Sequence, residues 1–506
     1  MTSQTAMLGL SLALIAVVAA WGVIDPTGLV AGASAVVGQL FTSRAWFIMI
    51  SVSAMLVLCF VLAFTRCGDI RLGRDEDRPE FPTISWLTML FAAGMGVGLL
   101  FWAAAEPLGH FALAHDFEPA PMAAEHALFI TNFHWGLHAW AIYGSTALAI
   151  AYFGFRRGCP LLVSAPFVAE FPRERWAVAL GWVADFLSIV AIAIGVAGSI
   201  AMGVFQVADG VDVLVGGDGA GAGLVLLVLV LLVACYLPPL AVDLGSGMAL
   251  LSNLAMGIAG ALLAFIILVG PTAYLMNSIV ESFGVYLANA FTHGFATFTF
   301  FDERVENWFQ DWTLTYMVWW LAWGPFVGVF IARISKGRTI REFVLGVLLV
   351  PTAFSIVWFG AFGGLGFYET LQGEGVLAEV AAARSERVTF VILENLPLSS
   401  LTTLATVLAA FLFVVTSVVS AAFVLGMFST GGNPDPSRKI KLIWGGLLGV
   451  LGYALILSGS IDAIKKVIAL GAMPFVFITI LILVCLVRAM RREMAGGAEG
   501  LAHADR

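Results

Sequence analysis

The feature that most limits how this chain can fold is a series of apolar runs of about 20 residues, which recur from near the first residue almost to the last. A helix of about 20 apolar residues is long enough to cross the hydrocarbon core of a bilayer. The 506 residues are 60% hydrophobic and only 11% charged, which is outside the usual balance of a soluble domain. The sequence therefore predicts one large helical bundle embedded in a membrane.

Charged, glycine-containing or proline-containing breaks divide these runs into twelve expected spans. They lie near residues 7–24, 45–65, 83–105, 125–153, 179–206, 222–240, 248–276, 307–331, 341–363, 397–425, 440–459 and 461–487. A secretory signal peptide carries Lys or Arg before its apolar run, and no Lys or Arg precedes the first run here. We therefore expect this run to be a retained helix. An even number of spans places both termini on one side of the membrane.

Lys and Arg are divided unequally between alternate connections, eighteen in one set and six in the other. The larger set is Arg66, Arg71, Arg74, Arg78, Arg156, Arg157, Arg173, Arg175, Arg333, Lys336, Arg338, Arg341, Arg438, Lys439, Lys441, Arg488, Arg491 and Arg492. The smaller set is Arg44, Arg304, Arg384, Arg387, Lys465 and Lys466. Because cytoplasmic loops are enriched in Lys and Arg, we expect both termini in the cytoplasm and the chain in a bacterial inner membrane.

Several classes of function are disfavoured by composition. The formal net charge of −8, without a basic stripe, argues against a nucleic-acid partner. The five cysteines lie far apart with no C-x-x-C pair, so we interpret them as packing residues. His134 and His138, with His126 and Glu125 nearby, have a spacing that could seat a metal in a membrane-embedded enzyme, and this is the remote alternative.

Two expected spans carry helix-breaking residues. The third has glycines at alternate positions, Gly94, Gly96 and Gly98, and the eighth has Gly324 followed by Pro325. Unpaired backbone groups are tolerated in a membrane only where protein or a water-filled cavity surrounds them, so such breaks predict a binding site. The two spans are five apart, as the first helices of two inverted five-helix repeats would be. Close packing of helices through small residues is the alternative for the glycines.

Aromatic residues gather on the fourth and eighth spans. They are Trp135, Trp140 and Tyr143 on the fourth, and Trp319, Trp320 and Trp323 on the eighth. Several ring faces around one cavity attract a quaternary ammonium group, each contact contributing about 0.5–2 kcal/mol once water is excluded. An interfacial tryptophan belt is the alternative, and it fits an isolated Trp better than this cluster.

These motifs resemble the betaine/carnitine/choline transporter family over nearly the whole chain. The resemblance rests on residues 93–99, Glu106-Pro107, 134–143, 311–328 and 413–420. It implies an all-α membrane protein with twelve transmembrane helices, in which two inverted five-helix repeats of the LeuT-type fold follow two N-terminal helices. It also implies a homotrimer.

The expected organisation has five segments. They are residues 1–82 with two N-terminal helices and a cytoplasmic loop, 83–278 with the first repeat, 279–306 with an outer interfacial helix, 307–488 with the second repeat, and 489–506 as a short cytoplasmic tail. The interfacial helix is expected near residues 279–300, where Phe283, Tyr286, Leu287 and Phe291 have near-helical spacing.

The resemblance also implies the site. The cationic end of a substrate would bind among Trp135, Trp140, Tyr143, Trp319, Trp320, Trp323 and Phe326, next to Gly94, Met95, Gly96, Gly98 and Phe101 of the interrupted third span. A sodium ion, the one expected cofactor, would be held by Ala92, Met95, Phe413, Thr416 and Ser417. Gly98 is similar to carriers of zwitterions, whereas an Asp at this place goes with choline.

Two departures from the family pattern limit what is carried over. Val418 and Val419 stand where many relatives have an Asp after the Thr-Ser pair, and the largely apolar stretch 195–199 argues against a second sodium. The sequence therefore favours sodium symport of a small zwitterion such as glycine betaine, an osmolyte. Proton coupling or ion-independent exchange remains open, as do choline, carnitine, trimethylamine oxide, a sulfonium or a sulfonate as the solute, and a solute sensor or passive channel is a further alternative.

Overall fold

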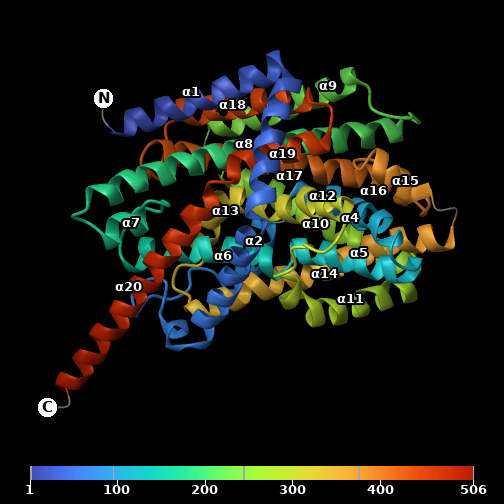
Figure 1. Ribbon diagram of the computed structural model, residues 1–506. Helices are drawn as coiled ribbons and strands as arrows, with labels where there is room; N and C mark the ends of the chain where they lie inside the picture. Colours follow the sequence, from blue (N-terminus) through green and yellow to red (C-terminus); the bar gives the residue numbers. More distant parts are fainter. Residues whose placement is uncertain (1–2, 95, 243–244, 374–375, 505–506) are drawn as a thin grey trace.

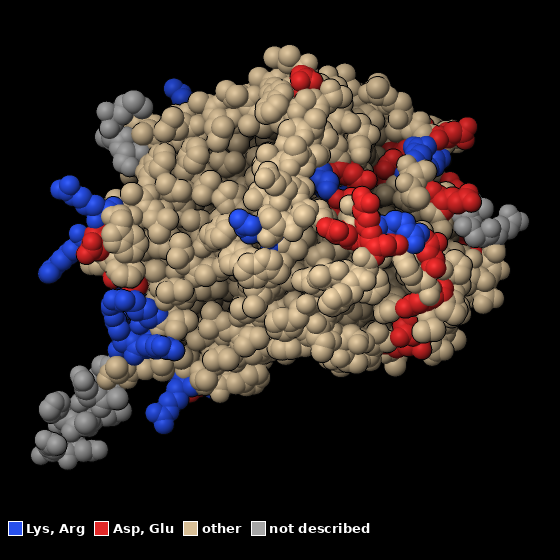
Figure 2. Space-filling model, viewed as in Figure 1, with Lys and Arg blue, Asp and Glu red and all other residues tan. Residues whose placement is uncertain are grey.

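Helices that run side by side form the whole molecule (Figure 1). The computed structural model describes residues 3–94, 96–242, 245–373 and 376–504, and these residues contain no β-strand. Both termini lie at the same end of the bundle (Figure 1). On the face shown in Figure 2, Lys and Arg gather mainly at that end, Asp and Glu gather mainly at the opposite end, and a belt with few charged residues separates them. We call these the basic end and the acidic end.

The first half of the chain contributes α1 (Ser3–Ile24), α2 (Pro26–Phe64), α3 (Thr83–Gly94), α4 (Val97–His115), α5 (Ala120–Trp135), α6 (Leu137–Ala151), α7 (Ala165–Glu170), α8 (Arg175–Leu214) and α9 (Ala222–Ala241). The second half contributes α10 (Gly245–Val269), α11 (Thr272–His293), α12 (Glu303–Phe309), α13 (Thr315–Ile334), α14 (Ile340–Gln372), α15 (Val376–Ala383), α16 (Val388–Glu394), α17 (Ser399–Ser429), α18 (Arg438–Ile456), α19 (Ile461–Ala472) and α20 (Phe475–Ala504). A 3-10 turn, Arg66–Asp69, and two π-helical turns, Tyr152–Arg156 and Gln310–Leu314, join them.

Each of the twelve expected segments lies mainly within helices, but fewer qualify as single membrane spans. Within the described residues, ten helices are long and apolar enough to cross a membrane, and counting the pair α19 and α20, bent by 41°, makes eleven. The expected span 125–153 is split at Gly136 into α5 and α6, of 16 and 15 residues, and each alone is shorter than the roughly 20 residues that a span requires. The chain is a multi-pass membrane protein.

The expected interruption of the third span is present. α3 ends at Gly94 and α4 begins at Val97, and Gly96 at the start of α4 has a non-helical ψ of −146°. Met95 lies outside the described residues. The break therefore falls within the glycine cluster.

The expected interruption of the eighth span is wrong. α13 runs without a break from Thr315 to Ile334, and Pro325 lies inside it. Its glycines serve close packing: a Cβ added at Gly328 would lie 3.2 Å from the Thr146 methyl group, and one at Gly324 would lie 3.5 Å from Thr146 Oγ1. Small residues at this spacing let α6 and α13 approach each other closely. Close helix packing was the alternative to an interrupted helix for the glycines of both spans.

The break at Gly136 was not expected, and side chains of other helices satisfy its backbone. The N–H of Leu137 donates to Tyr286 Oη at 2.7 Å, Trp320 Nε1 donates to the His134 carbonyl at 2.8 Å, and Ser355 Oγ donates to the Trp135 carbonyl at 3.1 Å. A membrane provides no water for such groups, so these bonds make the interruption tolerable.

A helix is present where the amphipathic helix near 279–300 was expected, but α11 begins earlier, at Thr272, and ends at His293. Its apolar residues do not share one face. Tyr286 is buried against the Gly136 break, whereas Leu287 and Phe291 are exposed. α11 is therefore tied into the bundle through Tyr286.

We predict that Gly136→Ala destabilises the protein by roughly 1–3 kcal/mol. A Cβ at this position would lie 2.2 Å from Tyr286 Oη and 2.5 Å from the Asn132 carbonyl oxygen, so both must shift. Thermal unfolding of the protein in detergent would measure the loss. Gly257→Ala on α10 is the matched control, because nothing lies within 4 Å of its added Cβ. Equal melting temperatures for the two variants would contradict the prediction.

Candidate functional site

A cavity lies in the middle of the bundle, between the α3–α4 break and helices α5, α6, α8, α13 and α17. It is lined by Gly96, Val97, Gly98, Trp102, Trp135, Tyr143, Ser199, Tyr316, Trp319, Trp320, Trp323 and Ser417. Aromatic rings make up most of this wall, and the described residues that line it include no charged side chain. A cavity of this type suits a small ligand with a cationic, apolar-surfaced group.

Trp320 stands at the centre of the aromatic wall. Its ring meets the Trp135 ring at 5.2 Å and 87°, and the Tyr143 ring at 5.1 Å and 77°. Rings at right angles form the corner of a box. The indole N–H of Trp320 is held by the His134 carbonyl, so the ring is fixed in this orientation.

Most of the predicted substrate-binding residues line this cavity. They are Trp135, Tyr143, Trp319, Trp320, Trp323, Gly96 and Gly98. Gly98 makes room for a cage ring, because a Cβ there would lie 3.1 Å from Trp135 Cη2. Gly94 is the last residue of α3, and Met95 lies outside the described residues.

Three predicted residues are not part of the cavity wall. Trp140 is fully buried behind Tyr143, with ring centroids 5.7 Å apart. Phe101 is fully buried against Trp102 at 4.8 Å. Phe326 lines a different cavity, and its ring lies 5.5 Å from the ring of the cage residue Trp323. These rings support the cage from behind or from one side.

Four wall residues were missed: Val97, Trp102, Ser199 and Tyr316. Helical periodicity could have found two of them, since Trp102 lies four residues after Gly98 and Tyr316 lies four residues before Trp320. Ser199 comes from α8, and nothing local in the sequence places α8 beside the other helices.

The predicted sodium ligands are only partly brought to the cavity. Ser417 lines it, and its Oγ lies 3.5 Å from the position of a Cβ added at Gly96. Thr416, one residue earlier, donates to the carbonyls of Leu412 and Phe413 at 3.0 and 3.1 Å. The side chain of Ala92, like Met95, lies outside what the structure describes. The α17 hydroxyl Ser417 therefore faces the α3–α4 break, as a shared site would require.

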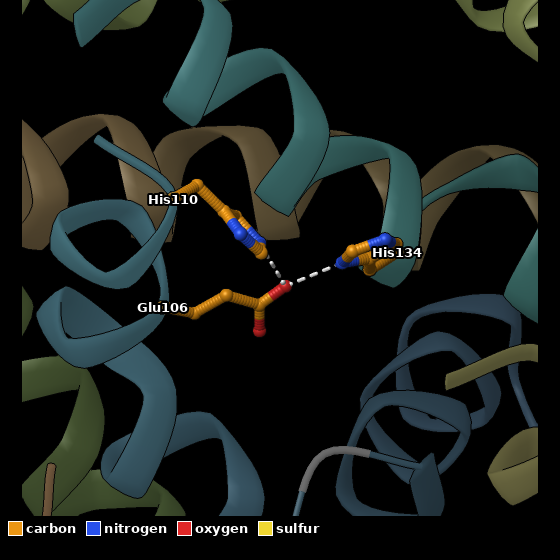
Figure 3. A group of neighbouring side chains, drawn as sticks. All are labelled: Glu106, His110 and His134. Atoms are coloured by element: carbon orange, nitrogen blue, oxygen red, sulfur yellow. Dashed lines mark hydrogen bonds and ion pairs between the residues drawn. The ribbon is translucent and has the colours of Figure 1, made fainter. Parts of the chain in front are cut away.

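A buried carboxylate adjoins the cage (Figure 3). Glu106 on α4 is fully buried, and its Oε1 accepts from His134 Nδ1 at 2.7 Å and from His110 Nε2 at 3.4 Å. Its Oε2 accepts from Trp135 Nε1 at 2.8 Å and from Tyr316 Oη at 2.5 Å. Glu106 was noted in the sequence only as part of a motif; an acidic residue inside an apolar span was itself a signal.

The structure does not bring together His134 and His138, the pair considered from the sequence as metal ligands. His134 lies with Glu106 and His110, and not with His138, whose ring packs on Phe133 at 4.7 Å; His126 is exposed beside Glu118. By residue type Glu106, His110 and His134 could hold a metal ion. Their atoms are instead bound to one another and to neighbouring donors, so the cluster is satisfied as a hydrogen-bond network.

Separate cavities approach the cage from the two ends of the molecule. The basic-end cavity is lined by residues that include Phe326, Ser420, Arg333, Arg438 and Lys441. The acidic-end vestibule is lined by residues that include Trp102, Trp312, Glu386, Asp462 and Lys465. Trp102 belongs to both the vestibule and the cage, whereas the Trp323–Phe326 pair, 5.5 Å apart, joins the cage to the basic-end cavity.

The acidic-end mouth of the cage is closed. Trp102 and Tyr316 are 1% and 2% exposed, and the buried ammonium of Lys465 lies 4.0 Å from the centre of the Trp312 ring. Asp462 pairs with the same ammonium at 2.8 Å. Toward the basic end, Trp323 and Ser417 are partly exposed.

Comparison with known proteins places this arrangement in a family. The pattern of the family described as BCCT, betaine/carnitine/choline family transporter, matches residues 6–495. The chain belongs to the betaine/carnitine/choline transporter family. It is a transporter and not an enzyme.

Several betaine transporters are similar over most of their length. The glycine betaine transporter of Bacillus subtilis is 37% identical over 484 residues, 95% of this chain and 93% of the relative. A probable glycine betaine transporter of Desulfitobacterium hafniense is 33% identical over 97% of this chain and 98% of its own. A betaine/ectoine transporter of Corynebacterium glutamicum is 32% identical over 96% and 78%.

We predict that a cysteine at the cage is reached from the basic end. The variant Ser417→Cys is made in a background without the native cysteines and treated with a membrane-impermeant thiol reagent. We expect the reaction to be on the order of tenfold faster when the reagent is added on the side that carries a terminal tag, a ratio equivalent to about 1.4 kcal/mol. Ser420→Cys, in the basic-end cavity, is the control for reagent access. Lys465→Ala should raise the rate from the opposite side, and equal rates from both sides of the parent would contradict the closed acidic-end mouth.

Proposed function

We propose that this protein is a secondary active transporter that imports glycine betaine or a closely related zwitterion together with sodium by alternating access. The observation that carries the proposal is the box formed by Trp135, Tyr143 and Trp320, placed between cavities at the two ends of the bundle. The names of the similar betaine transporters support the substrate class.

The two ends of a zwitterion need different partners, and the cavity offers both. A trimethylammonium group has no N–H, so ring faces suit it better than hydrogen-bond acceptors do. The carboxylate requires donors, which the backbone around Gly96 and Gly98 can supply at the start of α4, where the helix dipole also favours an anion. The substrate would therefore lie between the box and the α3–α4 break.

Sodium fits the same break from its other side. Ser417, beside Gly96, supplies a hydroxyl, and the C-terminal end of α3, residues 92–94, would supply carbonyl oxygens. Oxygen ligands of this kind suit a hard cation. Because ion and substrate would share one interrupted segment, binding of one would order the backbone that the other uses, which is a physical basis for symport.

Alternating access would exchange the closed and open ends of the cage. At the acidic end, the contacts among Trp102, Trp312 and Lys465 would have to separate. At the basic end, Trp323 and Phe326 would have to close over the cage. We assign these movements to two inverted five-helix repeats, residues 83–278 and 307–488, rocking against each other.

The same proposal includes the setting of the protein. The segregation of charge in Figure 2, with the termini at the basic end, supports an inner-membrane protein with both termini in the cytoplasm. The acidic-end vestibule would then face outward. A homotrimer is proposed from the family resemblance alone.

We predict that proteoliposomes take up labelled glycine betaine only with an inward sodium gradient, and that Trp320→Ala lowers uptake about tenfold or more, since it removes the shared wall of the box. Ser417→Ala, which removes the hydroxyl beside Gly96, should raise the sodium concentration needed for half-maximal uptake. Trp46→Ala is the matched control, because Trp46 on α2 is 61% exposed and is not among the residues that line the cavity. Uptake unaffected by sodium would rule out the coupling, and full uptake by Trp320→Ala would rule out the box.

We predict that Gly98→Asp shifts selectivity from glycine betaine toward choline. The Cβ of either Gly98→Ala or Gly98→Asp presses on the Trp135 ring, so both should weaken betaine uptake. Only the Asp variant adds a negative charge that can balance a cation lacking its own carboxylate. The choline-to-betaine ratio, measured by competition, should therefore rise on the order of tenfold in the Asp variant relative to the Ala variant. The same ratio in both variants would contradict the charge argument.

A further inference from the structure

Glu106 has no role in the proposed transport cycle, although it is a carboxylate buried in a membrane span beside the cage. A buried charge in a membrane is costly, and such a residue is a candidate functional site. Its surroundings show what kind of function it can have.

The carboxylate is surrounded by four donors and by no cation. His134, His110, Trp135 and Tyr316 all donate to it, and among the described residues no Lys or Arg lies within 4.0 Å. Hydrogen bonds of this number favour the ionised form of a carboxylate. They stabilise the charge without cancelling it.

The hydrogen bonds around the two histidines can all be made with both rings neutral. Trp308 Nε1–H can only donate, so His110 Nδ1, 3.0 Å away, accepts, and the proton of His110 is on the Nε2 that faces Glu106. His134 donates from Nδ1 to Glu106, and its Nε2 can accept from the Thr313 hydroxyl at 2.9 Å. With both rings in this form, the cluster carries a net negative charge.

Two of the four donors are walls of the cage. Trp135 and Tyr316 both line the cavity and both donate to Oε2 of Glu106. A donor group bound to an anion pushes electron density into its own ring, which makes the ring face more attractive to a cation. The His134 carbonyl also holds Trp320, so the third wall is attached to the same cluster.

We propose that Glu106 is the counter-charge of the aromatic cage, a positioning residue that holds Trp135 and Tyr316 and makes the cage prefer a permanent cation to a neutral group of the same shape. It acts through the rings, because they stand between its carboxylate and the cavity. This inference rests on the proposed function, since it assumes that a quaternary ammonium occupies the box.

Equilibrium binding to the purified full-length protein in lipid nanodiscs tests it with two probes, glycine betaine and 3,3-dimethylbutyrate. The second replaces the quaternary nitrogen by carbon, so it keeps the shape and the carboxylate and loses only the positive charge. Tryptophan fluorescence reports both. Glu106→Gln should weaken betaine binding about tenfold or more while leaving dimethylbutyrate binding unchanged or stronger, so the betaine preference falls.

Two further variants separate charge from structure. Tyr316→Phe keeps a ring at the cavity and removes one bond to Glu106, so the betaine preference should fall by less than in Glu106→Gln. Glu170→Gln is the matched control: this carboxylate is also buried, but it pairs with Arg488 and Arg492 at 3.3 and 3.1 Å, away from the cage. The control should keep the full preference.

The outcomes distinguish the two proposals. If the wild-type protein binds betaine and the betaine preference survives in Glu106→Gln, only the role of Glu106 is overturned. If Glu106→Gln does not fold, a preference that survives in Tyr316→Phe has the same meaning. Equal weakening of both probes also overturns it, because a purely structural support would act that way. Wild-type protein that binds neither probe overturns the proposed function, and this inference with it.

Discussion

Every backbone N–H and C=O inside a membrane must find a partner within the protein, and the candidate binding site of this transporter is built around the places where a helix fails to provide one. At the Gly136 break, Tyr286, Trp320 and Ser355 take up the freed groups of Leu137, His134 and Trp135. One of these bonds also orients a wall of the cage. The interruption and the ring orientation are therefore parts of one arrangement.

The buried charge extends the same principle to side chains. Four hydrogen bonds satisfy Glu106, and they come from α4, α5 and α13, so the carboxylate joins three helices that line the cavity. A carboxylate that is fully hydrogen-bonded but not neutralised keeps its field in a medium of low dielectric constant. Structural support and attraction for a cation thus have one source.

In the proposed cycle, the two ends of the cage would be closed by different means. At the acidic end, ions take part: Lys465 lies over Trp312, and nearby Asp209 of α8 binds Arg384 between α15 and α16 at 2.5 Å. At the basic end the contact is between the rings of Trp323 and Phe326. In the proposed cycle, opening the acidic end would require charged groups to separate, whereas closing the basic end would require only that rings move together.

The sequence by itself determined the membrane bundle, the approximate location of most of the apolar helices and most of the aromatic wall, because hydrophobic length and helical spacing are local properties. The tertiary structure alone decided which breaks occur. Pro325 stays within α13, where Gly324 and Gly328 pack against α6, whereas Gly136 interrupts a run that looked continuous. It also decided that Glu106 meets His134 and Tyr316, which lie 28 and 210 residues away along the chain. Such contacts depend on which helix faces lie together, and local periodicity does not encode the partner.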